Sequence, residues 1–257
     1  SEMKQSSTTV KEIIKEAKRG KMFILVDNKD RENEGDLVIP ASKINAKKIN
    51  FMAKHGRGLI CLALTQEKVK KLKLPLMSLI NKSRTQTAFT VSIEAKKGIS
   101  TGISAYDRAK TIKVAIKNSS GSKDIVSPGH VFPLVSKNGG VLERAGHTEA
   151  SVDISKLAKL NPSAVICEVM NEDGTMARYN DLVPFSKKHN LKIAKIEDLI
   201  SYRLKNEKFI KMISNRKINI KRFGNYDLKV FKNKLDGEEH YAVISKKFSY
   251  RKSPRVR

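Results

Sequence analysis

Residues 27–36 read Asp-Asn-Lys-Asp-Arg-Glu-Asn-Glu-Gly-Asp, and five of these ten side chains are acids. The apolar run 22–26 before them is typical of a buried strand, and a second short strand is predicted over 37–40. α/β proteins commonly place ligands in loops at the ends of buried strands. The segment is therefore either a solvated turn or a site for a divalent cation, which prefers carboxylate oxygens as ligands. The loop alone leaves both interpretations open.

The rest of the chain is strongly basic. Its 257 residues include 52 Lys and Arg against 26 Asp and Glu, a net charge of +26. Such a charge favours nucleic-acid binding, which is the alternative function we consider. The lysines, however, are scattered along predicted helical faces, and no aromatic residues for base stacking alternate with them. We therefore expect only nonspecific contact with nucleic acid.

The apolar segments are short. The longest runs span five or six residues, whereas a membrane-spanning helix needs about 20. The first residues contain no apolar stretch of the kind found in a secretory signal. Cys61 and Cys167 both lie inside apolar runs, so we expect two buried thiols in a reducing compartment rather than a disulfide. These features predict a cytoplasmic protein without membrane contact.

Helical and strand patterns alternate through about residue 205, which predicts an α/β or mixed α+β fold. A capping box at Thr9 and Glu12 opens the first helix, and Ser42 is predicted to cap the second. Helices are predicted over 10–19, 42–55, 65–72, 104–116, 148–160, 181–189 and 197–205. Strands are predicted over 22–26, 37–40, 59–64, 87–95, 131–135, 164–170 and 191–195. Beyond residue 205 we expect short strands over 226–231 and 241–245 and a loose basic tail over 246–257.

Polar residues that can do chemistry lie where loops meet these elements. Glu168 stands in the apolar run 165–170, where a carboxylate needs a partner or a raised pKa, and both favour a site. Residues 144–148 place a guanidinium, small residues and a hydroxyl before a helix, which is a good phosphate site. His147 can also ligate a metal there. The full set is Asp27, Arg31, Glu32, Glu34, Asp36, His130, Arg144, His147, Thr148 and Glu168.

Six segments together resemble one enzyme family. They are residues 30–37, 55–61, 89–93, 101–109, 128–134 and 144–150. In this order and spacing they resemble 3,4-dihydroxy-2-butanone 4-phosphate synthase of riboflavin biosynthesis. The resemblance covers residues 8–205, and it implies a layered αβα domain that forms a homodimer with active sites at the subunit interface.

The resemblance also implies the reaction and its residues. The substrate would be D-ribulose 5-phosphate, and the products L-3,4-dihydroxy-2-butanone 4-phosphate and formate. Glu32 and His147 would hold Mg²⁺ or Mn²⁺, and His130 and Glu168 would be essential for catalysis. The substrate would contact Arg31, Glu32, Asp36, Arg144, Ala145, Gly146, His147, Thr148 and Glu168.

Residues 206–257 resemble a different domain. Segments 222–226, 239–244 and 254–257 are similar to the opening strands of GTP cyclohydrolase II, a domain that is commonly fused behind the synthase. The zinc-binding cysteines of that family are absent from this segment, which has His240 as its single histidine. We therefore predict a small β-rich remnant without GTP cyclohydrolase activity.

Overall fold

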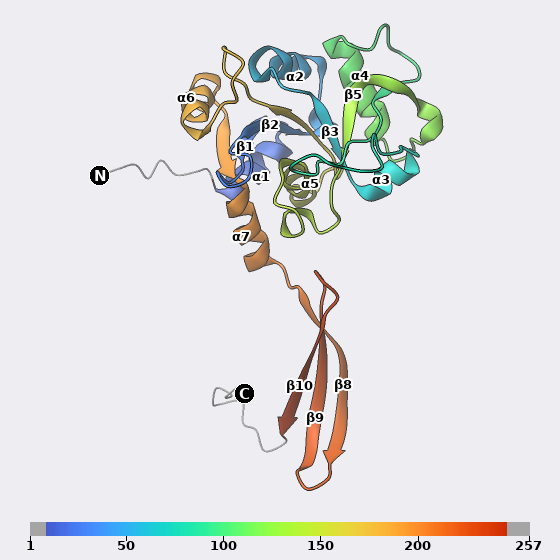
Figure 1. The fold of residues 1–257 in the computed structure, drawn as a ribbon, viewed down its shortest axis with the longest axis vertical. Coiled ribbons are helices and arrows are strands. Elements are labelled where there is room, and N and C mark those ends of the chain that lie inside the picture. Colours follow the sequence, from blue (N-terminus) through green and yellow to red (C-terminus); the bar gives the residue numbers. More distant parts are fainter. Residues whose placement is uncertain (1–8, 246–257) are drawn as a thin grey trace, which may run out of the picture. The chain divides into compact units, whose positions relative to one another are not determined.

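The structure is a computed structural model that describes residues 9–245. The chain divides between Arg203 and Leu204 into two compact units. The first unit is built around a seven-stranded sheet with helices beside it, and the second around three strands (Figure 1).

The sheet of the first unit has the strand order β4-β5-β3-β6-β2-β1-β7. Strands β1 and β7 pair in parallel, as do β3 and β5, and the other neighbours are antiparallel. Every residue of β1, β2 and β3 is buried, because these strands are covered on both faces. The strands are β1 (Phe23–Val26), β2 (Gly35–Pro40), β3 (Cys61–Leu64), β4 (Ile93–Ala95), β5 (Ile125–Val135), β6 (Ala164–Glu168) and β7 (Lys192–Lys195).

Two hydrophobic clusters cover the two faces of this sheet. One contains side chains of α2 (Ala46–Phe51), α3 (Gln66–Lys71), α4 (Ala105–Ile116) and α6 (Tyr179–His189). The other contains side chains of α1 (Val10–Lys18), α5 (His147–Leu157) and α7 (Ile196–Asn206). Alternate residues of one strand enter opposite clusters, as Ile24 and Leu25 do. The predicted three-layer αβα fold is confirmed.

Within residues 9–245, no helix has both the length and the apolar character needed to cross a bilayer.

Local signals set most helix starts. The predicted capping box is present, with Thr9 Oγ1 accepting from the Glu12 backbone and the Glu12 carboxylate accepting from the Thr9 backbone. The predicted cap at Ser42 is wrong, because Ser42 lies in the 3₁₀ turn η1 (Ala41–Lys43). Asn45 caps α2 instead, accepting from the Lys48 backbone at 3.0 Å. The helical path then ends in a π-helical turn, η2 (Met52–Gly56).

The predicted strand over 87–95 is mostly wrong, since only Ile93–Ala95 forms β4. Phe89 and Thr90 make isolated bridges to Leu134 and Leu76. Strand β5, in contrast, is longer than predicted because its first residues pair with β4 across a bulge. Two further short elements precede and follow it, η3 (Ser122–Asp124) and η4 (Gly140–Leu142).

The second unit is an antiparallel sheet in the order β10-β9-β8. Its strands are β8 (Ile210–Ile220), β9 (Gly224–Asn233) and β10 (Glu239–Ser245). Strand β8 was not predicted, although Ile218 and Ile220 alternate with polar residues as strand residues do. No residue of this unit is buried within its described part. The predicted tail over 246–257 lies outside the described residues, and the assignment of the unit to a GTP cyclohydrolase II remnant stays a prediction.

Candidate active site

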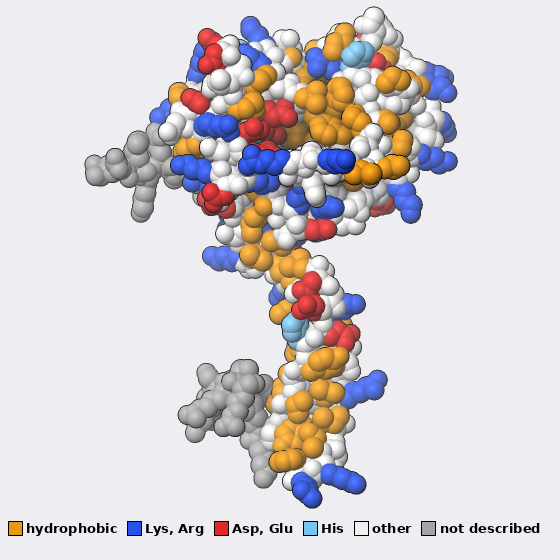
Figure 2. All heavy atoms as spheres, viewed as in Figure 1, with side chains coloured by type: hydrophobic (Ala, Val, Ile, Leu, Met, Phe, Trp, Pro, Cys, Tyr) orange, Lys and Arg blue, Asp and Glu red, His pale blue; other side chains and the backbone are white. Residues whose placement is uncertain are grey.

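A pocket of about 450 Å³ opens at the ends of two central strands of the first unit's sheet, where β2 begins and β6 ends. On the face drawn in Figure 2, acidic side chains gather in a hollow with Lys and Arg side chains beside it. The pocket collects most of the predicted site residues. Its lining is Arg31, Glu32, Glu34, Asp36, Cys61, Arg84, Thr85, Thr87, Phe89, Leu134, Arg144, His147, Thr148, Ile166, Glu168 and Arg178.

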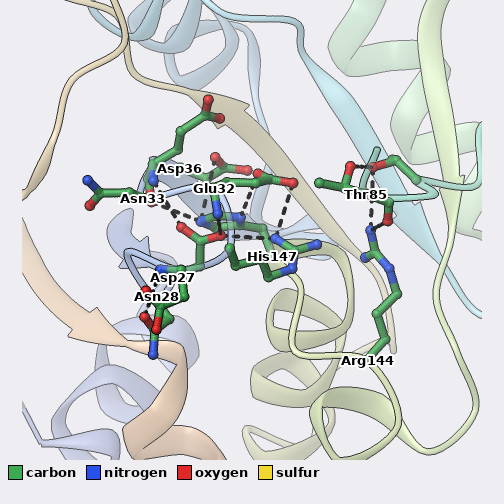
Figure 3. Close-up of polar contacts among 12 residues, drawn as sticks. Asp27, Asn28, Glu32, Asn33, Asp36, Thr85, Arg144 and His147 are labelled. Atoms are coloured by element: carbon green, nitrogen blue, oxygen red, sulfur yellow. Dashed lines mark hydrogen bonds and ion pairs between the residues drawn. The ribbon is translucent and has the colours of Figure 1, made fainter. Parts of the chain in front are cut away.

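Asp27 organises the acidic loop. Its carboxylate accepts hydrogen bonds from the backbone of Glu32 at 3.0 Å and of Glu34 at 2.9 Å, and from Arg31 Nη1 at 3.0 Å. Arg31 Nη1 also lies 3.1 Å from Glu32 Oε1. The loop therefore folds around one buried carboxylate, and Figure 3 shows Asp27 close to Glu32. Arg31 and Glu32 both line the pocket.

Arg178 fixes the same loop from outside. Its Nη1 donates to the carbonyl oxygens of Glu32 at 2.7 Å and Asn33 at 2.8 Å. Asn33 adopts a left-handed conformation with φ of 53°, which Asn tolerates better than most residues. Arg178 is separated from Glu32 by 146 positions in the sequence and from Asn33 by 145. No local sequence pattern could therefore predict these hydrogen bonds.

His147 is the first residue of α5 and lies against the acidic loop. Its Nδ1 is 3.8 Å from Glu32 Oε2, and its Nε2 is 3.9 Å from Asp36 Oδ1 and 3.3 Å from the Glu34 carbonyl oxygen. Ligand atoms of Asp27, Glu32 and His147 all lie within 4.8 Å of one another. Asp27 already accepts three hydrogen bonds and does not line the pocket, whereas Glu32 and His147 both line it.

Asp36 and Glu168 are brought together by strand pairing. They are direct partners in the antiparallel register of β2 and β6, and side chains of such pairs face each other. Glu168 Oε2 accepts from the Leu59 backbone at 2.8 Å. Burial raises the pKa of Asp36 well above its usual value, and the Glu168 carboxylate raises it further. The pocket thus holds a pair of neighbouring carboxyl groups, and the pKa of Asp36 in this pair is raised.

The floor of the pocket includes a thiol that stays neutral. Burial raises the pKa of Cys61 well above its usual value, and Glu168 and Asp36 add to the effect. Cys167 faces away into the core of the opposite face, and burial raises the pKa of its thiol as well. Both cysteines are free and buried, as predicted.

Arg144 belongs to a second group of side chains, away from the acidic cluster in Figure 3. Its Nη1 donates to Glu149 Oε1 at 2.6 Å, and its Nη2 donates to the Thr85 carbonyl at 2.8 Å. A side chain at Gly146 would meet the Arg144 guanidinium, which would then have to shift, so the glycine leaves room for that guanidinium at its present position. Thr148 lies in the first turn of α5, where helical N–H groups lack intrahelical acceptors.

Some predicted residues lie outside the pocket lining. Ala145 is exposed, and Gly146 supports the loop without lining the cavity. His130 on β5 is also absent from the lining, and its side chain is 44% exposed. Glu94 holds its ring, with Oε2 2.8 Å from His130 Nδ1 and Oε1 accepting from the His130 backbone at 2.8 Å. Within a single chain, therefore, His130 does not line the pocket that contains Glu168.

The pocket also contains residues that the sequence analysis did not single out. Arg84, Thr85, Thr87 and Arg178 add polar groups to its lining. Arg84 donates a hydrogen bond to the Arg31 carbonyl oxygen at 3.4 Å. This contact places the segment around residue 84 next to the acidic loop. A cation-rich run at 82–84 was the available signal, but lysines and arginines are common throughout this chain.

Comparisons with known proteins agree with this geometry. A family model described as 3,4-dihydroxy-2-butanone 4-phosphate synthase matches residues 11–202. A curated relative of that name from Photobacterium phosphoreum is 51% identical over 236 residues, which make up 92% of this chain and 65% of the relative. The chain thus spans less than two thirds of that relative's length.

Two solved structures share the fold. RibBX from A. baumannii, described as a two domain 3,4-dihydroxy-2-butanone 4-phosphate synthase, aligns with a TM-score of 0.82 at 46% identity, over 93% of this chain and 70% of RibBX. A 3,4-dihydroxy-2-butanone 4-phosphate synthase in complex with two magnesium ions aligns with a TM-score of 0.74 at 36% identity, over 77% of this chain and 98% of that one. The resemblance predicted from the sequence motifs is confirmed.

Proposed function

Because the chain belongs to the 3,4-dihydroxy-2-butanone 4-phosphate synthase family, we propose that it converts D-ribulose 5-phosphate to L-3,4-dihydroxy-2-butanone 4-phosphate and formate. This is a carbon–carbon lyase reaction of riboflavin biosynthesis. The observation that carries the proposal is the convergence of Glu32, Asp36, His147 and Glu168 in one pocket beside Arg144.

The reaction explains why so many ionisable groups meet in a small space. A proton next to the sugar carbonyl is removed to give an enediolate, water leaves, the carbon skeleton rearranges, and C4 departs as formate. Several of these steps move a proton, and side chains in hydrogen-bond reach of the substrate must give or take it. A cavity of about 450 Å³ that is lined by four carboxyl groups and an imidazole meets that need.

The residues of the pocket fit a divalent cation, Mg²⁺ or Mn²⁺. Glu32 and His147 would hold it, and Asp27 would keep Glu32 in place through the Glu32 backbone N–H. Two protein ligands leave further positions for water and sugar oxygens, as Mg²⁺ sites commonly do. When bound, the ion stabilises negative charge on vicinal substrate oxygens. The related structure with two magnesium ions supports this assignment.

The substrate phosphate would bind at residues 144–148. Backbone N–H groups at the start of α5 and the positive end of its dipole favour an anion there. Arg144 supplies a guanidinium whose position is set by Glu149. Arg31 and Asp36 would contact the sugar hydroxyls from the opposite wall, so the substrate would lie between the two groups of side chains.

We further propose a homodimer in which each chain supplies His130 to the pocket of the other. Two observations support it. His130 is half-exposed and outside the pocket of its own chain. Large apolar side chains are also exposed in the segment that leads to Thr85, with Leu79 95% and Ile80 71% exposed, as at an interface between subunits.

The two essential groups then have distinct roles. Glu168, which is fixed by the Leu59 backbone, would transfer protons on the chain that holds the metal ligands. His130, which is oriented by Glu94, would do so from the partner chain. Glu94 sets which ring nitrogen of His130 can face the substrate.

Two further proposals follow from composition. The buried free thiols of Cys61 and Cys167 fit a reducing cytoplasm.

The +26 charge should attract nucleic acid only nonspecifically, so that binding fades steeply as salt rises. A sequence preference that persisted near 0.2 M salt would instead favour the nucleic-acid function.

The direct test is to incubate the purified chain with D-ribulose 5-phosphate and Mg²⁺ and to measure formate. We expect formate with Mg²⁺ or Mn²⁺ and none after chelation. Absence of formate with either ion would refute the proposed activity.

The shared site has its own test by subunit mixing. His130→Ala and Glu168→Gln should each be inactive alone. After unfolding and refolding together, half of the dimers should be mixed and carry one intact site each, which restores about a quarter of wild-type activity. If mixing restores nothing while mixed dimers form, each site is built from a single chain.

A further inference from the structure

A second cavity lies on the other side of the acidic loop from the catalytic pocket. It has a volume of about 510 Å³, and we call it the reverse pocket. Val26 and Lys195 line it, at the carboxyl ends of the parallel neighbours β1 and β7. Ligands of open α/β sheets bind outside such strand ends, and the volume falls within the range of small-molecule sites.

The wall between the two cavities is the loop itself. Arg31, Glu32 and Glu34 line the catalytic pocket, whereas Asn33 lines the reverse pocket. Arg178 lines both and donates to the carbonyl oxygens of Glu32 and Asn33. Anything that moved this guanidinium would loosen the loop that carries the proposed metal ligand Glu32.

The charge of the reverse pocket favours an anion. Lys29, Arg178 and Lys195 line it, against Glu197 and Asp27. The carboxylate of Asp27 is already taken up by Arg31 and two backbone N–H groups. Lys195 Nζ is 3.9 Å from Glu197 Oε1, and among the described residues Lys29 has no ion-pair partner. Two cations therefore remain for a ligand after Lys195 and Glu197 offset each other.

The lining also offers an aromatic ring and amide groups. Tyr179, the first residue of α6, lies in the wall with its ring centroid 5.4 Å from Lys195 Nζ. Rings of this kind stack with planar bases. The cations can bind a phosphate, and the aromatic ring can stack with a base. A cavity of this size therefore fits a ligand that carries both groups better than a free phosphate or a free base.

We propose that the reverse pocket binds a mononucleotide-sized phosphate ester and that its occupancy opposes catalysis. The ligand phosphate recruits Arg178 and so weakens the two hydrogen bonds that fix the acidic loop. Metal or substrate at Glu32 then weakens nucleotide binding by the same factor, because coupling between two sites is reciprocal. The effect on catalysis rests on the proposed function, whereas the binding does not.

The test measures binding first. The full chain without metal is titrated with AMP by calorimetry, with adenosine and inorganic phosphate as comparisons. The double variant Lys29→Gln/Lys195→Gln removes two cations of the reverse pocket. Its matched control is Lys96→Gln/Lys97→Gln, which removes the same charge at exposed positions elsewhere.

We expect AMP to bind with at least tenfold loss of affinity in Lys29→Gln/Lys195→Gln and less than twofold change in the control. Adenosine and inorganic phosphate should bind at least tenfold more weakly than AMP. Equal loss in both double variants would mean general charge attraction and would overturn the proposal. So would absence of AMP binding, or equal affinity for inorganic phosphate.

The second measurement is inhibition of formate release by AMP. It should be present in the wild type and the control but lost in Lys29→Gln/Lys195→Gln, whose uninhibited activity should be unchanged. Binding that leaves formate release unaffected would overturn the coupling. If the chain releases no formate at all, the proposed function fails and the calorimetric result still decides the binding site.

Discussion

The two units of this chain are both built on β-sheets, yet they differ in what covers the sheet. In the first unit, helices pack on both faces and every residue of β1 and β2 is buried. In the described part of the second unit no residue is buried, and Ile210 and Val243 are 63% and 52% exposed. A sheet alone removes little apolar surface from water, so only the first unit gains a large stabilisation from burial.

The difference also decides where chemistry can occur. In the first unit the covered sheet holds Asp36 and Glu168 side by side at the edge of the core, and burial raises the pKa of Asp36. The charged side chains in the described part of the second unit are all exposed or half-exposed, so water screens their interactions. Residues 206–257 carry 15 basic and 5 acidic side chains, a distribution that favours solubility rather than catalysis.

The largest expected effect is the loss of turnover when a pocket residue of the first unit is changed. Glu168→Gln should lower turnover by about 10²–10⁴-fold, because a lost proton-transfer group typically has that effect. Mg²⁺ affinity should change little, whereas Glu32→Gln should weaken it. Steady-state kinetics measures the turnover of both variants, and metal titration measures their Mg²⁺ affinity. Near-normal turnover of Glu168→Gln would show that Glu168 is not the acid–base group.

A matched pair of core and surface substitutions compares the stability of the two sheets. Ile39→Ala in β2, where the side chain is fully buried, should lower the free energy of unfolding by about 2–5 kcal/mol. Ile210→Ala in β8, where it is 63% exposed, should change it by less than about 1 kcal/mol. Urea denaturation measures both. Similar losses would mean that the second sheet is covered in solution.

The smallest effect is expected from removing the second unit. A chain that ends at Lys205 should release formate at a rate within about twofold of the full chain, since the pocket lies within the first unit. The full chain should release no formate from GTP with zinc, since a hydrolytic zinc site needs about three protein ligands. Loss of synthase activity in a truncated chain that still dimerises would contradict this prediction.

Sequence patterns predicted much of the site because its residues stand in conspicuous settings. Glu168 interrupts an apolar run, and Glu32 and His147 belong to motifs that carry the family resemblance. Their convergence in one pocket agrees with those predictions. The roles of individual residues stay predictions, and His130 shows why, since the proposed catalytic histidine does not line the pocket that contains Glu168.

What the sequence did not predict depends on long-range contacts. Arg178 clamps carbonyl groups more than 140 positions away, and backbone acceptors leave no pattern in the side chains. Asn45 rather than Ser42 caps α2 because an intervening turn shifts the helix start. The segment around Phe89 makes bridges to Leu134 instead of a full strand, although its alternation is typical of one.

The most direct measurement follows one carbon atom. D-ribulose 5-phosphate labelled with ¹³C at C4 is incubated with the chain and Mg²⁺, and the products are observed by ¹³C NMR. We predict that the label appears in formate, that chelation of the metal abolishes it, and that Glu168→Gln slows its appearance. Label that stays in the substrate, or enters another product while formate remains unlabelled, would contradict the proposed reaction.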